Sequence, residues 1–253
     1  MRPATLYFHG LPGSAAELAS FGPAIAAQAG HFHVVDRSAA PGEGYFPSLA
    51  ARIAAQYPDQ PLHLVGFSLG AAAALQVAPC LGARVDRIDL ISPAAPLQLG
   101  DFLDDMAGAP VFRAALAGRM PFAALTFMQA QVARIAPAKM AAALMAKARG
   151  ADRALAADPR FIAGLAQSLH QSLLAQRAAY SAEIRAYVAD WSATLAKVHQ
   201  PVTIWQGSED DWTPPAMAEA LAAHLPSTPA MLMQPGCSHF STLRAYLKAK
   251  ACP

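Results

Sequence analysis

The stretch Pro61-Leu-His-Leu-Val-Gly-Phe-Ser-Leu-Gly70 decides the fold of this chain. A mostly apolar run over 61–65 predicts a buried strand, and the Ala/Leu-rich run over 71–77 predicts a helix. A Gly-x-Ser-x-Gly sequence between strand and helix is typical of a sharp turn that holds the serine hydroxyl above the sheet. Ser68 is therefore a candidate nucleophile, and the alternative is a plain tight turn.

A serine nucleophile needs a base, and the base needs an acid that fixes its tautomer. The run over 202–207 reads as a buried strand that ends at a glycine, and an acidic cluster follows it. Glu209, Asp210 and Asp211 are the candidate acids. Taken alone, the cluster favours a solvated loop at the end of a strand.

The candidate base follows another apolar strand, over 231–234, which ends in a Pro-Gly turn. His239 lies just beyond this turn and close to the C-terminus, so we expect it to be the general base. The other seven histidines lack this placement: His9, His31, His33, His63, His170, His199 and His224.

These stretches, with His9-Gly10 after the first apolar run, resemble the α/β-hydrolase superfamily, in its serine esterase and proline-iminopeptidase-like branches. The family's Gly-x-x-Asp-x-x-x-Pro spacing implies Asp210 as the acid, with Ser68 and His239 as its partners. The resemblance also implies an oxyanion hole formed by the backbone N–H groups of Leu11 and Leu69. His9 is better interpreted as a residue that organises the loop than as a catalytic one.

The resemblance implies an α/β fold with a mostly parallel sheet flanked by helices. The chain enters its first strand at about residue 4, so the family's first two strands have no room and we expect six strands. The segment over 38–47 is a short Gly/Pro loop, which departs from the family's usual pattern and puts in doubt the substrate contacts made there. The ranges expected are strands at 4–9, 32–36, 62–66 and 86–92 and helices at 15–29, 47–57 and 69–79.

Between 94 and 198 the strand signals vanish, and prolines and glycines divide an Ala/Leu/Met-rich region into four or five expected helices. We therefore predict an α/β-hydrolase core over 1–93 and 199–253, with a helical cap over 94–198. The cap's Met and Phe side chains line an apolar substrate pocket or form ordinary core. Three arginines of this region have two possible roles: Arg113, Arg119 and Arg134. They bind a substrate carboxylate, or they lie on solvated helix faces, which is the more common place for an arginine.

Composition limits the remaining function classes. The 253 residues carry a net charge of +2, which favours neither nucleic acid nor an anionic membrane as a partner. Three cysteines without motif spacing predict no disulfide framework and a reducing compartment. We expect no metal, no cofactor, no signal peptide and no membrane span, and hence a cytoplasmic protein that acts on a small molecule.

The expected function is hydrolysis of a carboxylic ester of a small to medium apolar substrate, through an acyl-enzyme on Ser68. The same triad also serves amide or peptide, thioester and carbon–carbon bond cleavage, or a non-hydrolytic elimination, and the fold does not choose between them. A catalytically silent binding protein is the alternative from another class. Branches that need a carboxylate nucleophile are disfavoured, because a serine stands at 68.

Overall fold

The computed structural model of this protein describes residues 3–38 and 44–250. Residues 39–43, in the middle of the predicted loop over 38–47, and Cys252 lie outside the described residues. Six parallel strands form one sheet in the order β2-β1-β3-β4-β5-β6, which confirms the expected fold and strand number. The strands are β1 (Ala4–Phe8), β2 (Phe32–Val34), β3 (Leu62–Phe67), β4 (Val85–Ile91), β5 (Val202–Gly207) and β6 (Ala230–Gln234).

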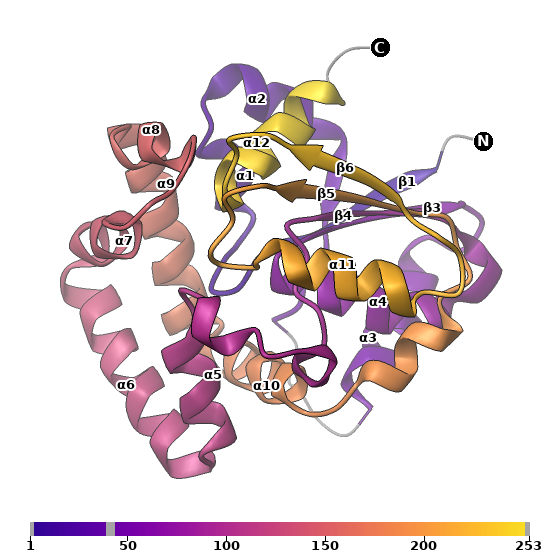
Figure 1. Cartoon of the computed structure of the whole chain (residues 1–253), viewed down its shortest axis with the longest axis horizontal. Helices are drawn as coiled ribbons and strands as arrows, with labels where there is room; N and C mark the ends of the chain where they lie inside the picture. Colours follow the sequence, from indigo (N-terminus) through magenta and orange to yellow (C-terminus); the bar gives the residue numbers. More distant parts are fainter. Residues whose placement is uncertain (1–2, 39–43, 251–253) are drawn as a thin grey trace.

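Helices cover both faces of the sheet (Figure 1). One face carries α3 (Tyr45–Gln56), α4 (Leu69–Leu81) and α11 (Pro215–His224), and the other carries α2 (Pro23–Gln28) and α12 (His239–Ala249), with α1 (Ala16–Ala19) beside them. Ten of the thirteen residues of α4 are buried. Five of its residues are alanines, so this helix packs close to the central strands β1 and β3, whose own side chains are buried on both faces.

The single helix expected over 15–29 is wrong, because the structure divides this segment into α1, α2 and a short 3₁₀ turn at Ala29–His31. The break is at Gly22, whose φ of 97° lies in the region that favours glycine. Pro23 then starts α2 at the first helical position, where its missing N–H costs no hydrogen bond. The Gly-Pro pair is the local signal that predicts this division.

The chain between β4 and β5 contains only helices and turns. It forms six α-helices, one more than the upper expectation, and a π turn at Gln171–Ala175. Pro110, Pro137 and Pro159 stand in the first turn of their helices, so they start helices rather than end them. The six are α5 (Ala109–Leu116), α6 (Arg119–Ile135), α7 (Pro137–Met145), α8 (Asp152–Ala156), α9 (Pro159–His170) and α10 (Arg177–Val188). Most of them gather beyond the carboxyl ends of the strands, on the left of Figure 1.

Candidate active site

Ser68 occupies the turn between β3 and α4, with φ 57° and ψ −127°, a conformation that few non-glycine residues adopt. The turn brings strand and helix backbones into close contact. A Cβ added to Gly66 would lie 2.5 Å from Cα of Ala71, and one added to Gly70 would lie 2.0 Å from the carbonyl oxygen of Phe8. Both flanking positions therefore require glycine, as a strained serine turn does.

Asp210 follows β5 and His239 begins α12, and the structure brings the two side chains together. His239 Nδ1 lies 3.0 Å from Oδ2 and 3.2 Å from Oδ1 of Asp210, and both residues are buried. Oδ1 also accepts the backbone N–H groups of Trp212 and Thr213 at 2.9 Å each. The Thr213 hydroxyl donates to Oδ2 at 3.2 Å. These contacts hold the carboxylate in one orientation toward the imidazole.

The Asp210–His239 pair is arranged to keep the carboxylate charged. Burial opposes ionisation of Asp210, but the charge and hydrogen bond of His239 and the N–H of Thr213 outweigh it and lower the pKa of the carboxyl below its usual value. The His239 ring packs between Phe67, at 4.7 Å, and Trp212, at 5.6 Å and 18° from parallel. An ionised Asp210 places the ring proton on Nδ1, which leaves Nε2 as the acceptor.

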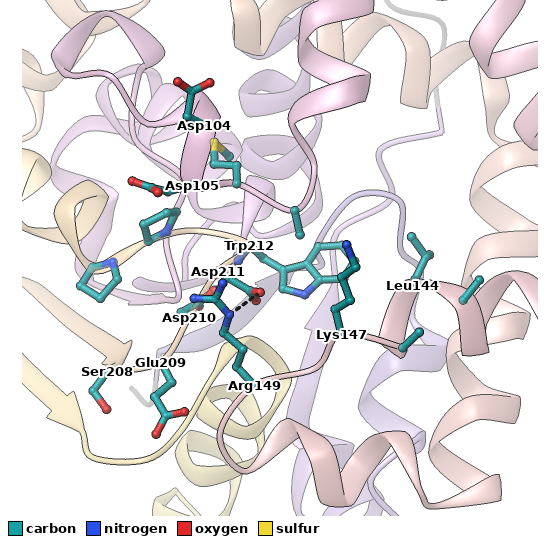
Figure 2. A pocket seen from close by; sticks show the side chains of 16 residues that line it. Asp104, Asp105, Leu144, Lys147, Arg149, Ser208, Glu209, Asp210, Asp211 and Trp212 are labelled. Carbon is teal, nitrogen blue, oxygen red and sulfur yellow. Dashed lines mark hydrogen bonds and ion pairs between the residues drawn. The ribbon is translucent and has the colours of Figure 1, made fainter.

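The two competing acids of the loop point elsewhere. Asp211 pairs with Arg149 at 3.1 Å, and both residues line an outer pocket of about 690 Å³ together with Glu209. Figure 2 shows this pocket, with the Trp212 indole beside the Arg149–Asp211 pair and Glu209 directed away from both. Of the three acids proposed from the sequence, only Asp210 has a contact with His239.

Ser68 and His239 line one small cavity beside Gly10 and Leu11. No hydrogen bond joins Ser68 Oγ to His239 within the described residues, although the two side chains face the same space. Serine–histidine contacts of this kind often shorten only when substrate binds. The arrangement places a base, oriented by a buried acid, in the wall of the same cavity as the serine.

The two residues predicted to supply the oxyanion hole line a cavity together with the serine. Leu69 is the first residue of α4, so its N–H is one of the groups that no helical carbonyl satisfies. Leu11 follows Gly10 in the loop after β1, and neither amide is used in a backbone hydrogen bond in the described part of the chain. Leu11 lines the serine cavity, and both leucines line the larger cavity described next.

A second cavity, of about 190 Å³, also opens on Ser68. Helices α5, α6, α7 and α10 of the 94–198 segment contribute to its wall, together with Trp212 and Thr213 from the loop after β5. Of the Met and Phe residues in the 94–198 segment, Met106, Phe112 and Met140 line it. Arg113, Arg119 and Arg134 do not, and Arg113 instead pairs with Asp104 at the surface.

Comparison with protein families decides the assignment. The model described as "Alpha/beta hydrolase family" matches residues 6–247, which is nearly the whole chain. This protein belongs to the alpha/beta hydrolase family. A comparison with curated protein sequences gave no match.

Solved structures of other proteins share the fold of this alpha/beta hydrolase. The enol-lactonase from Burkholderia xenovorans LB400 is 17% identical, with a TM-score of 0.65 over 98% of this chain and 90% of that one. A thermophilic esterase from Thermogutta terrifontis is 17% identical, with a TM-score of 0.64 over 99% and 91%. The bromoperoxidase from Bacillus anthracis is 16% identical, with a TM-score of 0.61 over 98% and 90%. At these identities the likeness concerns the fold alone.

The sequence did not reveal Glu17, a buried carboxyl of this alpha/beta hydrolase that lines the serine cavity. Its Oε1 accepts the Tyr7 hydroxyl at 2.5 Å and the Gly10 N–H at 3.1 Å, so it holds the loop that carries Leu11. Burial raises the pKa of Glu17 to about 7, against the opposing effect of these hydrogen bonds. No motif marks this residue, because its partners meet only in the folded chain.

Two further buried contacts tie the helical segment to the site. Arg37 donates to Glu183 of α10 and to the His9 carbonyl, both at 2.5 Å, which links that segment to the loop after β1. Burial, followed by the charge of Arg37, lowers the pKa of His9 to about 3, so this histidine is neutral and structural, as interpreted from the sequence. Asp152 of α8 accepts the N–H groups of Phe240 and Ser241, at 3.0 and 2.6 Å, at the start of the helix that His239 begins.

Other features of this alpha/beta hydrolase bear on the remaining expectations. Within residues 3–38 and 44–250, no group of three or more His, Cys, Asp or Glu side chains has the arrangement of a metal site. No helix in the same ranges combines the length and apolarity needed to cross a membrane. Cys80 and Cys237 are free thiols.

Proposed function

We propose that this protein is a serine hydrolase that cleaves a carboxylic ester through an acyl-enzyme on Ser68. One observation carries the proposal. His239 is hydrogen-bonded through Nδ1 to the buried, ionised Asp210, and it lines the same cavity as Ser68 on its strained turn. A serine next to a histidine that an acid orients is the arrangement needed to activate a hydroxyl at neutral pH.

In the first half of the reaction, Ser68 Oγ attacks the ester carbonyl carbon and its proton moves to His239 Nε2. The tetrahedral intermediate then expels the alcohol, which takes the proton from His239 as the carbon–oxygen bond breaks. Water attacks the acyl-enzyme in the second half, and His239 accepts its proton and returns it to Ser68 Oγ as the bond between the acyl carbon and Oγ breaks and the carboxylic acid leaves. Asp210 stabilises the imidazolium in both halves and keeps its own charge.

The N–H groups of Leu11 and Leu69 are proposed to bind the oxyanion. Both residues line a cavity with Ser68, and neither N–H group donates a backbone hydrogen bond among the described residues, so both are available to stabilise the charge that develops on the carbonyl oxygen. Glu17 supports this role for Leu11 by holding the preceding residue, Gly10. Removing one such donor lowers catalysis by about 10²–10³-fold in enzymes of this type.

The helical segment over 94–198 is proposed to act as a cap that encloses the substrate. Its helices α5, α6, α7 and α10 supply much of the wall of the 190 Å³ cavity beside Ser68. The wall is largely apolar, which fits an apolar part of the substrate. The names esterase and enol-lactonase of two structural relatives agree with ester chemistry.

The test is hydrolysis of p-nitrophenyl esters from acetate to palmitate. We expect turnover by the wild type, loss of turnover in Ser68→Ala, and wild-type rates in Ser227→Ala, a serine that contacts Gln200 away from the described site. The cavity volume predicts an optimum at short to medium chains. Turnover that survives Ser68→Ala, or none by the folded wild type, contradicts the proposal, and the second result favours another bond or a binding role.

A further inference from the structure

Helix α6 forms the outer edge of the helical segment, on the lower left of Figure 1, and its outward side is apolar. Four of its large apolar side chains are more than half exposed: Met120, Phe127, Met128 and Ile135. Spacings of seven, eight and fifteen residues from the first of them place all four on one side of an α-helix. We call these four side chains the apolar face of α6. The opposite side of the helix is buried through Phe122, Thr126, Ala130 and Ala133.

The outward side of a helix in a globular protein usually carries charged and polar residues. The charged residues of α6 are Arg119 and Arg134, and the helix contains no acid. Arg134 follows Phe127 by seven residues, so it lies in line with the apolar face. Arg177, at the start of α10, places its guanidinium carbon 5.8 Å from the centre of the Phe127 ring. Cations therefore border the apolar face, and no carboxylate of α6 does.

The net charge of +2 is distributed unevenly along the chain. Residues 106–151, which include α5, α6 and α7, contain six Lys and Arg and no Asp or Glu. The rest of the chain has 13 Lys and Arg against 17 Asp and Glu. Of the six cations, only Arg113 and Arg149 form ion pairs with acids within the described residues. The segment that contains the apolar face thus has a charge of +6, whereas the remainder has −4.

An exposed group of large apolar side chains marks a site of contact with another molecule. A second copy of this chain would bring the same cations together, so their repulsion opposes the pairing of two α6 faces. A nucleic acid provides phosphates for the arginines but places the apolar face against a charged backbone. An anionic bilayer satisfies both, because its headgroups attract Lys and Arg and the acyl boundary beneath them accepts apolar side chains.

The shape of the surface also favours a bilayer. Met120 and Ile135 are 84% and 79% exposed, so these side chains project from the helix. No member of the apolar face lines the outer pocket or either cavity at Ser68, so none of these recesses is part of it. Projecting apolar side chains beside cations are typical of helices that lie in the plane of a membrane interface.

We propose that the apolar face of α6 docks this protein onto the surface of an anionic lipid bilayer. The apolar face enters the boundary between headgroups and acyl chains, and Arg119, Arg134 and Arg177 contact the lipid phosphates. The docking does not depend on the chemistry at Ser68, and it holds the protein at the surface without a segment that crosses the bilayer. Gln129 of the same helix lines the 190 Å³ cavity, so docking brings that cavity close to the lipid.

The test is co-sedimentation with lipid vesicles, using the full chain with Ser68→Ala so that no vesicle lipid is hydrolysed. Vesicles of phosphatidylcholine alone are compared with vesicles that contain about 30% phosphatidylglycerol. We expect a partition coefficient at least about tenfold higher on the anionic vesicles. Most of this difference is expected to disappear at about 0.5 M NaCl, because salt screens exposed charges.

Variants of the cations test the electrostatic part of the docking. Arg119→Gln with Arg134→Gln is expected to lower the partition coefficient on the anionic vesicles by about 25-fold, or about fivefold for each cation. The matched control is Arg244→Gln with Lys248→Gln, which removes two cations of α12, at the top of Figure 1 and away from α6. The control is expected to bind within about twofold of the parent protein.

A methionine pair tests the apolar part. Met120→Ser is expected to lower the partition coefficient by at least about fivefold, because the side chain no longer enters the acyl boundary. Met233→Ser, which changes an exposed methionine of β6, is expected to leave it within about twofold. Met120 does not contribute to the buried core, so this variant tests the proposal even if the double arginine variant does not fold.

The outcomes separate lipid from other occupants of the face. Absence of binding to either kind of vesicle overturns the proposal, and so does equal binding to both. Equal loss in the arginine variant and its control overturns it as well. Retention on immobilised poly-L-glutamate without vesicle binding assigns the face to an acidic protein instead, and a dimer that Met120→Ser dissociates assigns it to a second copy. Hydrolysis of p-nitrophenyl esters by the wild type without lipid tests the proposed function separately.

Discussion

Replacing Asp210 by Asn tests how the acid acts on the histidine. Oδ1 of Asp210 accepts two backbone N–H groups at 2.9 Å, so the oxygen of an asparagine is held at that position. Its NH₂ group then faces Nδ1 of His239, where Oδ2 now lies at 3.0 Å. The imidazole must accept at Nδ1 and carry its proton on Nε2, which is the wrong tautomer for taking the proton of Ser68.

The expected loss follows from the role of this tautomer. In a serine hydrolase with an intact oxyanion hole, the same change lowers kcat by about 10⁴-fold, or about 5 kcal/mol of transition-state stabilisation. Asp211→Asn is the matched control, because Asp211 pairs with an Arg149 side chain that is 63% exposed. An ion pair of that kind contributes about 0–1 kcal/mol to stability, and we expect kcat within about twofold of the wild type.

The assay is the initial rate of p-nitrophenyl butyrate hydrolysis at saturating substrate, with urea unfolding of each variant beside it. A folded Asp210→Asn protein whose kcat is within tenfold of the wild type refutes the assignment of the acid. So does a larger loss in Asp211→Asn than in Asp210→Asn.

Three further predictions concern the supporting contacts. Asp152→Asn removes one of two acceptors at the start of the helix that His239 begins, so we expect about 1–2 kcal/mol less stability in urea and a kcat about tenfold lower. Burial raises the pKa of Glu17 from 4.5 to about 7, so the folded state holds a proton that the unfolded state releases between these pH values. The stability that the wild type has relative to Glu17→Gln is therefore fully present below pH 4.5, and it falls by about 3 kcal/mol as pH rises through 7. Urea unfolding of both proteins at a series of pH values measures this difference in unfolding free energy. A difference that does not change with pH contradicts the prediction. Tyr187→Phe leaves a buried carbonyl unpaired and is expected to cost about 1–2 kcal/mol, whereas Tyr180→Phe costs under about 0.5, and equal costs oppose the view that Tyr180 is unpartnered.

The parts of the fold predicted correctly depend on local sequence. Gly66 and Gly70 around Ser68 mark a turn whose backbone contacts no other residue type permits, so seventeen residues were enough to place strand, turn and helix. The single helix expected over 15–29 is wrong, because Gly22-Pro23 breaks the helix inside this range. The Gly-Pro pair is a local signal, so the sequence alone is enough to predict this break.

The parts of the site that the sequence did not reveal depend on distant contacts. Nothing in the sequence around Glu17 indicates its role, because it meets its hydrogen-bond donors Tyr7 and Gly10 only in the folded chain. Arg37 and its partner Glu183 are 146 residues apart, and nothing in either segment indicates the pair. The Tyr180 hydroxyl has no hydrogen-bond partner among the described residues. This depends on the packing of the helices around it, which the sequence does not show.

The most direct test of the central claim is mass spectrometry of the protein after reaction with a fluorophosphonate, which bonds covalently to an activated serine. We expect one label per chain, located on the peptide that contains Ser68, and slower labelling of Asp210→Asn and His239→Ala. A folded wild-type protein that is not labelled, or a label on another residue that persists in Ser68→Ala, contradicts the assignment of Ser68 as the nucleophile.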